Sequence, residues 1–126
     1  MTLQEYFENT RGTGILGTAD SGGQIDLALY SRPHFLDNDD SIITFIMNDR
    51  LSHANLAANK KAAYLFKEEG PGHKGKRLYL TMIGEEKNSG KIDSIRRSTR
   101  HHTGEKTGDK FLVTFRVDRI RPLVGD

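Results

Sequence analysis

Six short runs of strand-forming residues constrain the fold of this chain more than any other feature. In two of them, 77–85 and 111–117, hydrophobic side chains recur at every second position, which places them on one face of a β-strand. The other runs are rich in hydrophobic, β-branched or aromatic residues and cover 14–19, 25–30, 42–47 and 62–66. The sequence therefore predicts a mainly β protein.

Two or three short helices are expected between the strands. Thr2 and Glu5 stand at the spacing of a capping box, so a first helix opens the chain. A second helix, 52–59, is rich in alanine, and Ser52 is its candidate N-cap residue. Residues 91–100 form either a weakly amphipathic, basic helix or an ordered loop.

Antiparallel strands joined by short turns favour a small barrel, because closure of the sheet leaves no exposed edges. The segment 68–76, which contains glycines and a proline, is expected to be a loop between the fourth and fifth strands. We therefore expect a six-stranded antiparallel β-barrel with a helix after the third strand. Its length is that of a single domain, residues 1–126.

Composition excludes several classes of function. The chain has no cysteine, which rules out disulfides, thiolate metal sites and cysteine nucleophiles and indicates a reducing compartment. It shows neither a signal-peptide pattern nor an apolar run long enough to cross a membrane, so we expect a cytoplasmic protein without a membrane partner. The hydrophobic fraction of 35% is low beside a charged fraction of 29%, which is compatible with further apolar burial in a dimer.

Two basic clusters, 73–77 and 96–102, are interpreted as solvated surface. The net charge of +2 is small, and no aromatic residues that could stack on bases alternate with either cluster. A nucleic-acid-binding barrel is therefore the weakest hypothesis. His101 and His102 are adjacent, so they lack the four-residue spacing that brings two imidazoles to one helix face, and no metal site is predicted.

The segment 45–56 is the strongest candidate for a binding site. A buried strand runs into a polar turn and then into a helix, whose N-terminus offers unpaired N–H groups and a partial positive charge. Arg50, Ser52 and His53 add a guanidinium, a hydroxyl and an imidazole near the same point. Such a turn suits a phosphate group. The alternative is that Ser52 caps the helix and that Arg50 is solvated.

This strand, turn and helix resemble those of the pyridoxamine 5′-phosphate oxidase-like FMN-binding split barrels, which include short dimeric FMN-binding proteins. Other matching features are the strand and turn 15–24, a second strand that ends at Arg32, the strand 78–84 and the closing segment 115–123. The likeness covers nearly the whole chain and lies in the order of its elements. It implies a split β-barrel that binds FMN at the interface of a homodimer.

The resemblance also implies which residues bind the flavin. The second and third strands line the flavin ring, which assigns Leu27, Ala28, Leu29, Tyr30, Phe45, Ile46 and Met47. The end of the second strand and the turn before the helix hold the phosphate, which assigns Arg32, Arg50, Leu51, Ser52 and His53. The partner subunit contributes from a later strand, which assigns Tyr79 and Thr81.

Two departures from the family pattern bear on function. The family's turn commonly carries an Arg-Lys or Lys-Thr pair where this chain has Leu51 and Ser52, which leaves Arg32, Arg50 and His53 to neutralise the phosphate. The true oxidase is longer and has a basic C-terminal segment that binds substrate, and this chain ends without it. Oxidation of pyridoxamine phosphate is therefore not expected.

The leading hypothesis is an FMN-binding homodimer that acts as a small oxidoreductase. The flavin would perform the redox chemistry, while the protein supplies binding, orientation and electrostatics. No catalytic residue is assigned, because this chemistry demands no acid or base from the protein. The alternative is a non-catalytic module that binds or carries a flavin, or that binds haem or a deazaflavin instead, and the altered phosphate turn favours that alternative.

Overall fold

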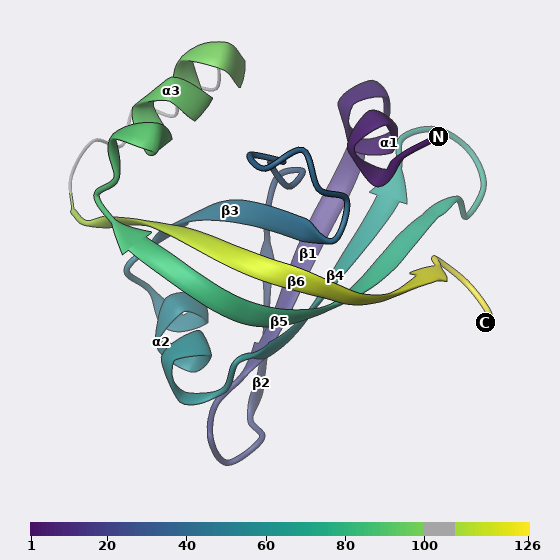
Figure 1. Ribbon diagram of the computed structural model, residues 1–126. Coiled ribbons are helices and arrows are strands. Elements are labelled where there is room, and N and C mark those ends of the chain that lie inside the picture. Colours follow the sequence, from purple (N-terminus) through teal and green to yellow (C-terminus); the bar gives the residue numbers. More distant parts are fainter. Residues whose placement is uncertain (100–107) are drawn as a thin grey trace.

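The computed structural model describes residues 1–99 and 108–126, which form three helices and six strands (Figure 1). The helices are α1 (Leu3–Asn9), α2 (Leu51–Ala58) and α3 (Gly90–Thr99). The strands are β1 (Gly12–Ala19), β2 (Ile25–Leu29), β3 (Ile42–Asn48), β4 (Lys61–Glu68), β5 (Gly75–Lys87) and β6 (Lys110–Pro122). The predicted mainly β class, with a helix after the third strand, is confirmed.

The strands form one antiparallel sheet in the order β2-β1-β4-β5-β6-β3. The sheet curls into a half-barrel, as the split-barrel prediction requires, and α1 and α2 lie at opposite ends of it (Figure 1). β2 and β3 are the edges of the sheet, and a single bridge between His34 and Thr44 lies beside β3. Residues that lie near α2 and residues that lie near α1 are therefore at opposite ends of the half-barrel (Figure 1).

The core fills the concave side of the sheet. Its fully buried members include Leu16, Ile43, Phe45, Met47, Leu56, Tyr64, Phe66, Leu78, Leu80, Val113 and Phe115. In β5 and β6 these are the side chains that the period of two predicted for one face. The ring of Phe45 lies 5.0 Å from the ring of Tyr64 and 5.9 Å from the ring of Phe115, centroid to centroid. Interlocking rings thus join the β3 edge of the sheet to β4 and β6.

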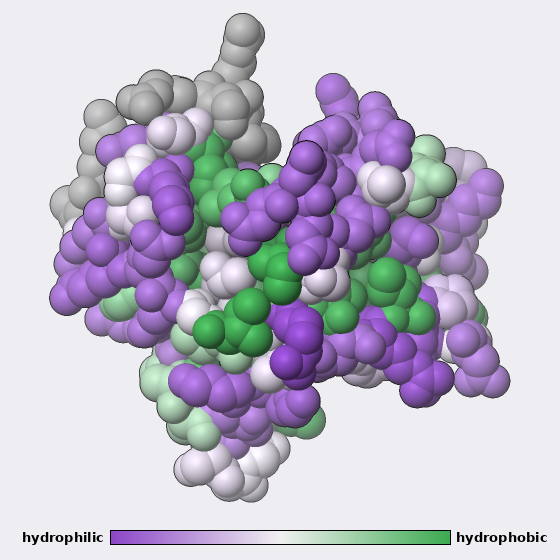
Figure 2. Space-filling model, in the orientation of Figure 1, coloured by the Kyte–Doolittle hydropathy of each residue, from purple (hydrophilic) through white to green (hydrophobic). Residues whose placement is uncertain are grey.

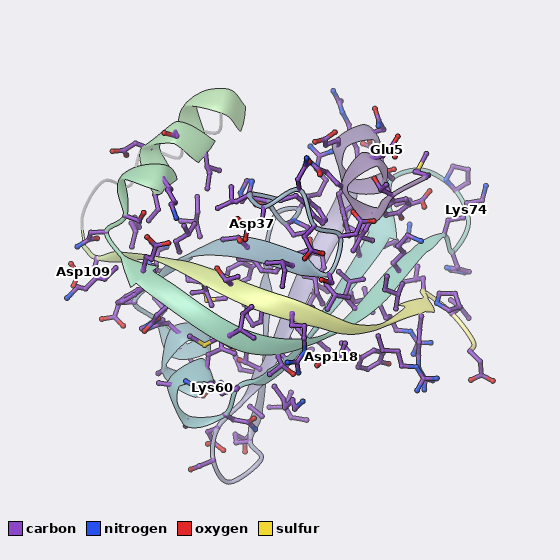
Figure 3. All side chains as sticks on the ribbon, viewed as in Figure 1. Glu5, Asp37, Lys60, Lys74, Asp109 and Asp118 are labelled. Carbon is purple, nitrogen blue, oxygen red and sulfur yellow. The ribbon has the colours of Figure 1, made fainter. Side chains whose placement is uncertain are left out.

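The predicted capping box starts α1. The Thr2 hydroxyl accepts a hydrogen bond from the Glu5 N–H at 3.1 Å, and the Glu5 carboxylate, labelled in Figure 3, accepts from the Thr2 N–H at 3.0 Å. Leu3 and Phe7 then face the core and are buried. The helix therefore covers the end of the half-barrel opposite α2.

The basic segment after β5 forms a helix, the first of the two alternatives predicted for it. In α3, Ile92 and Ile95 are buried against Leu112, and Ile46 packs at the margin of this second cluster. The cluster lies on the convex side of β3 and β6, because Ile46 and Leu112 alternate with residues of the main core. Within the described residues, no helix is both long enough and apolar enough to span a membrane.

The predicted boundaries of the last two strands were wrong. β5 and β6 extend beyond the hydrophobic runs 77–85 and 111–117, and the loop expected at 68–76 shortens to 69–74. The two strands pair along nearly their whole length, with register shifts after Tyr79 and after Met82. Backbone pairing needs no hydrophobic side chains, and bulges let long strands follow a strong curl. The periodicity of side chains therefore underestimates their length.

Candidate functional site

The turn between β3 and α2 has the chemistry of an anion-binding site. α2 begins at Leu51, and Arg50 is its N-cap residue, with extended backbone and no side-chain capping bond. The first turn of the helix, all of it within the described residues, contains no acidic side chain. No carboxylate within the helix therefore neutralises the N–H groups of its first turn or the positive end of its dipole. The turn places these donors beside a guanidinium.

Ser52 is not the helix cap that the sequence predicted, and that prediction was wrong. The residue lies inside the first turn and is only 5% exposed. Its hydroxyl faces the sheet and forms a hydrogen bond with Tyr30. Serine is a common N-cap residue, so composition placed the cap there, but the extended backbone needed at that position belongs to Arg50.

Tyr30 brings a second hydroxyl to this turn from the end of β2. Besides its bond to Ser52, it lies within the electrostatic reach of Arg50 and of Asp26. Burial raises the pKa of Tyr30, the Ser52 bond and the Arg50 charge oppose that rise, and Asp26 adds to it. The Tyr30 ring is held edge-on against Phe45 at 5.8 Å. The phenol therefore stays protonated at neutral pH and is able to donate to an anion.

A buried hydrogen bond fixes α2 to the sheet behind these groups. The Asn55 side chain donates to the Thr18 hydroxyl at 3.1 Å, and the two residues are 5% and 3% exposed. Buried polar groups in folded proteins are almost always paired in this way. Asn55 was not among the residues predicted for the site, although its position three residues after Ser52 on an alanine-rich helix indicates the same inward face.

His53 joins α2 to β5, to β6 and to the preceding turn. Its Nε2 lies 2.6 Å from a carboxylate oxygen of Glu85, and its Nδ1 lies 3.3 Å from a carboxylate oxygen of Asp49. The imidazole stacks on the Phe111 ring with centroids 3.7 Å apart. The structure therefore gives His53 an anchoring contact, whereas the sequence proposed it as one of the cations around a phosphate.

Arg32 lies at the α1 end of the half-barrel. Its guanidinium donates to the carbonyl oxygens of Phe7 at 2.8 Å and of Thr10 at 3.0 Å, at the last turn of α1. These are carbonyls that a helix C-terminus leaves without an intrahelical partner. Of the two arginines proposed for the phosphate, the structure therefore places only Arg50 at the β3–α2 turn.

The residues proposed to line a flavin ring divide between different faces. In β2, Leu27 and Leu29 point outward, with 68% and 76% of their surface exposed, while Ala28 and Tyr30 point inward. In β3, Phe45 and Met47 are core residues. Ile46 instead faces α3, on the convex side. Successive side chains of a strand alternate between its faces, so these proposed residues do not form one continuous lining.

The outward face of β2, β1, β4 and β5 is a continuous hydrophobic surface. It surrounds a hollow of about 240 Å³ lined by Ile15, Gly17, Leu27, Ala63, Tyr64, Leu65, Arg77 and Tyr79. The strand register places Leu27 beside Gly17, Gly17 beside Ala63 and Ala63 beside Tyr79. Together with Ile25 and Leu29, the hollow forms what we call the β2–β5 face.

Exposed hydrophobic side chains also occur elsewhere. Figure 2 shows hydrophobic side chains on the face formed by β3, β6 and β5, where hydrophilic side chains divide them. In β5 and β6, Ile83 and Ile120 are exposed by 50% and 47%. Scattered exposed hydrophobic residues are usual in soluble proteins. In β2, by contrast, Ile25, Leu27 and Leu29 are exposed by 67% to 76% and form a row. The β2–β5 face is therefore the stronger candidate for an interface.

Thr81, the second residue proposed to act across a dimer, lies on β5 beyond Tyr79. The Lys61 ammonium donates to its hydroxyl at 2.8 Å, and Thr81 in turn donates to the Asp118 carboxylate. Figure 3 labels Asp118 on β6 beside β5. The hydroxyl of Thr81 is therefore part of a polar network within its own chain.

The remaining sequence hypotheses concern metals and basic clusters. No group of three histidine or carboxylate side chains suited to a metal ion occurs in the described part of the chain. His73 and Lys74 are exposed in the loop before β5. The cluster 96–102, including His101 and His102, lies outside the residues whose side chains are described.

The fold is shared with solved structures, whereas no protein-family model and no curated protein sequence matches the chain. An FMN-binding protein from Syntrophomonas wolfei subsp. wolfei is 19% identical with a TM-score of 0.76, and the match covers 98% of this chain and 84% of that one. The haem storage protein HutZ from Vibrio cholerae is 16% identical with a TM-score of 0.67, over 97% of this chain and 95% of that one.

A candidate pyridoxamine 5′-phosphate oxidase from Lactobacillus delbrueckii is 15% identical with a TM-score of 0.66, over 93% of this chain and 88% of that one. The solved structures that share this fold thus include one named as an FMN-binding protein and one named as a candidate pyridoxamine 5′-phosphate oxidase, as the resemblance of the sequence implies. The resemblance to FMN-binding split barrels is confirmed at the level of the fold.

Proposed function

We propose that this chain, which has the fold of FMN-binding split barrels, binds FMN and acts as a small flavin-dependent oxidoreductase. The observation that carries the proposal is the meeting of Arg50, Ser52 and Tyr30 at the start of α2. The similar protein from Syntrophomonas wolfei, named as FMN-binding, supports the choice of cofactor. The cytoplasmic location expected from the sequence is part of the same proposal.

The residues at the turn fit a phosphate. Arg50 supplies a positive charge, Tyr30 supplies a hydroxyl donor held in place by Ser52, and the helix supplies N–H groups and its dipole. Asp26 also faces this region, so the phosphate would meet a mixed field rather than a purely positive one. Arg50 is therefore the residue on which phosphate affinity should depend most.

FMN would supply hydride or electron transfer at its ring, and the protein would position it. Tyr30 would hold a phosphate oxygen through its protonated phenol, and the Asn55–Thr18 bond would keep the turn rigid. Ala28 and the backbone of β2 would approach the rest of the cofactor from the inward side of the strand.

The proposed homodimer would cover the β2–β5 face. The row on β2 consists of Ile25, Leu27 and Leu29, which are exposed by 67%, 68% and 76%. Such a row is unusual for a monomer, because burial of hydrophobic side chains is the main driving force of association. β2 is also an edge of the sheet. A second copy that packs on this face would bury the row and lie beside the strand that carries Tyr30.

A non-catalytic binding module is the second candidate, and one observation favours it. Arg32 donates to α1 carbonyls, so the turn holds a single arginine where the family commonly has a basic pair. A weaker phosphate site would suit a module that binds haem, and the similar protein from Vibrio cholerae is named as a haem storage protein. Titration with haemin and with FMN, followed by their absorption bands, separates the two candidates.

The phosphate role of Arg50 is tested by comparing FMN with riboflavin, which lacks the phosphate. Arg50→Ala should weaken FMN binding about tenfold or more, the loss expected for a charge-assisted hydrogen bond, and should leave riboflavin binding nearly unchanged. Lys60→Ala, which removes an exposed cation after the other end of α2, is the matched control and should affect neither ligand. Equal losses for FMN and riboflavin in Arg50→Ala would refute the assignment.

A further inference from the structure

A hollow of about 330 Å³ lies between α1 and α3, and Figure 2 shows it at the top of the view. We call it the α1–α3 cleft. Its lining includes Phe7 and Glu8 of α1, Arg32, Phe35 and Leu36 of the segment after β2, and Ile95 of α3. Small-molecule sites are commonly hollows of roughly 300 to 1,000 Å³ with hydrophobic walls and a few polar groups. The cleft therefore has the size and the lining of such a site.

Arg32 brings a positive charge to the cleft. Its side chain is half-buried, and no carboxylate of the described residues forms an ion pair with it. Burial raises the pKa of Tyr64, and the charge of Arg32 opposes that rise, so the guanidinium lies close to the core. A cation that is partly removed from water is stabilised by an anion beside it. A bound anion would supply that partner.

The guanidinium is held in one orientation. Its Nη1 donates to the carbonyl oxygens of Phe7 at 2.8 Å and of Thr10 at 3.0 Å. Its Nε and Nη2 form one edge of the group, and neither makes a hydrogen bond to a described residue. Two parallel N–H groups on one edge match the two oxygens of a carboxylate, and a fixed group loses little entropy on binding. Arg32 is thus arranged for a bidentate contact.

The walls of the cleft select the rest of the ligand. The rings of Phe7 and Phe35 lie 6.3 Å apart, centroid to centroid, and Leu36 is an exposed hydrophobic side chain at the rim. Such walls favour a hydrocarbon or aromatic group. Glu8 is the only carboxylate among the described lining residues, and it would repel a second negative group on the ligand. The lining therefore suits a hydrophobic molecule with one carboxylate.

Arg32 also borders a second hollow, of about 570 Å³, together with Arg11, Lys67, Glu68 and Glu69. The described residues around this second hollow include no large hydrophobic side chain. Its two other cations are matched by two carboxylates, so its charges are largely balanced without a ligand. A hydrophobic carboxylate is therefore better accommodated in the α1–α3 cleft.

We propose that the α1–α3 cleft binds a small organic monocarboxylate. Its carboxylate accepts two hydrogen bonds from Arg32, and its hydrophobic body packs against Phe35 and Leu36. The cleft lies at the α1 end of the half-barrel, whereas the β3–α2 turn lies at the α2 end (Figure 1). The inference therefore goes beyond the proposed FMN site and does not depend on it.

The first test titrates the protein with benzoate, phenylacetate and hydrocinnamate, followed by saturation-transfer NMR. The neutral controls are the alcohols of the same shape: benzyl, phenethyl and hydrocinnamyl alcohol. We expect at least one carboxylate to bind about tenfold or more tightly than its alcohol, as for a charge-assisted hydrogen bond. Failure of all three carboxylates to bind at millimolar concentration, or equal affinities of acid and alcohol, would overturn the proposal.

The second test locates the carboxylate. Arg32→Gln should lower its affinity about tenfold or more, and Arg32→Lys, which keeps the charge without the paired N–H groups, should lower it less. Arg11→Gln removes an exposed cation that borders only the second hollow, so it is the matched control and should bind as the wild type does. Wild-type affinity in Arg32→Gln, or an equal loss in Arg11→Gln, would contradict the assignment.

A third test leaves Arg32 intact, because its bonds to the end of α1 also support the fold. Leu36→Asp places a negative charge at the rim of the cleft, and Leu36→Asn is its neutral control. The carboxylate should bind more weakly to Leu36→Asp than to Leu36→Asn, whereas the alcohol should not distinguish the two variants. Equal carboxylate affinities in the two variants would refute binding in this cleft.

Titration with FMN separates this inference from the proposed function. Arg32→Gln should bind FMN as the wild type does, because Arg32 lies away from the β3–α2 turn. A variant that loses FMN and keeps the carboxylates would return Arg32 to the flavin phosphate and overturn the proposal. A wild-type protein that binds the carboxylates but not FMN would support the proposal and contradict only the proposed function.

Discussion

Removal of the Tyr64 hydroxyl should destabilise the protein by an amount that the structure makes calculable. Tyr64 is fully buried, and its hydroxyl donates to the carbonyl oxygens of Ser31 at 3.0 Å and of Tyr30 at 3.2 Å. Tyr64→Phe keeps the ring and leaves both carbonyls without this donor. A hydrogen bond of this kind contributes about 0.5 to 1.5 kcal/mol, and an unsatisfied buried group adds to its loss, so we expect a cost of about 1 to 2 kcal/mol.

This cost translates into a shift in melting temperature. An unfolding entropy of about 2.1 cal/mol/K per residue over 126 residues gives about 0.26 kcal/mol/K, so the melting temperature should fall by about 4 to 8 °C. Differential scanning calorimetry measures the fall. Tyr79→Phe is the matched control, because no hydrogen bond of the Tyr79 hydroxyl occurs among the described residues, and its melting temperature should change little. Equal shifts in the two variants would refute the role given to the Tyr64 hydroxyl.

Two further predictions concern the interface and the pH dependence of stability. Leu27→Asp places a charge in the exposed row of β2 and should convert the proposed dimer to a monomer, as measured by size-exclusion chromatography with light scattering. Leu36→Asp changes a 43% exposed position outside that row and should leave the dimer intact. A dimer that survives Leu27→Asp would count against the interface. Burial raises the pKa of Tyr6 and of Tyr64 in the folded protein. Above pH about 10 the unfolded chain therefore loses phenol protons that the folded chain retains. The free energy of unfolding should then fall as the pH rises further. Urea unfolding between about pH 9 and 11 checks this, and a Tyr6→Phe, Tyr64→Phe double variant with an unchanged slope would contradict it.

The sequence predicted the fold because the sheet is built from local patterns. Phe111, Val113 and Phe115 alternate in the sequence, and the same residues face the core in β6. The ends of the strands were less predictable. β6 continues to Pro122 because β5 pairs with it there, and that pairing depends on a segment more than thirty residues away.

The outward face of β2 shows a second limit of periodicity. The alternation of Ile25, Leu27 and Leu29 predicts that one face of the strand is hydrophobic. It does not show whether that face meets the core of its own chain or another surface. In the structure the row is turned outward, so the pattern was correct and its location depended on how the neighbouring strands curl.

The candidate site was predictable where its residues are close in the sequence. Arg50 and Ser52 belong to one turn, and the sequence selected both. Tyr30 was selected for the flavin ring, and the structure brings its hydroxyl to Ser52 instead. The bond from Arg32 to the carbonyl of Phe7 joins residues 25 positions apart in different elements, and no local pattern announces it.

The most direct test of the account is the cofactor content of the protein purified without added ligand. We predict a yellow protein that releases FMN on denaturation, or a colourless one that takes up FMN to an equal molar ratio and shows the flavin absorption band. A protein that is colourless and fails to bind FMN at micromolar concentration would contradict the central claim.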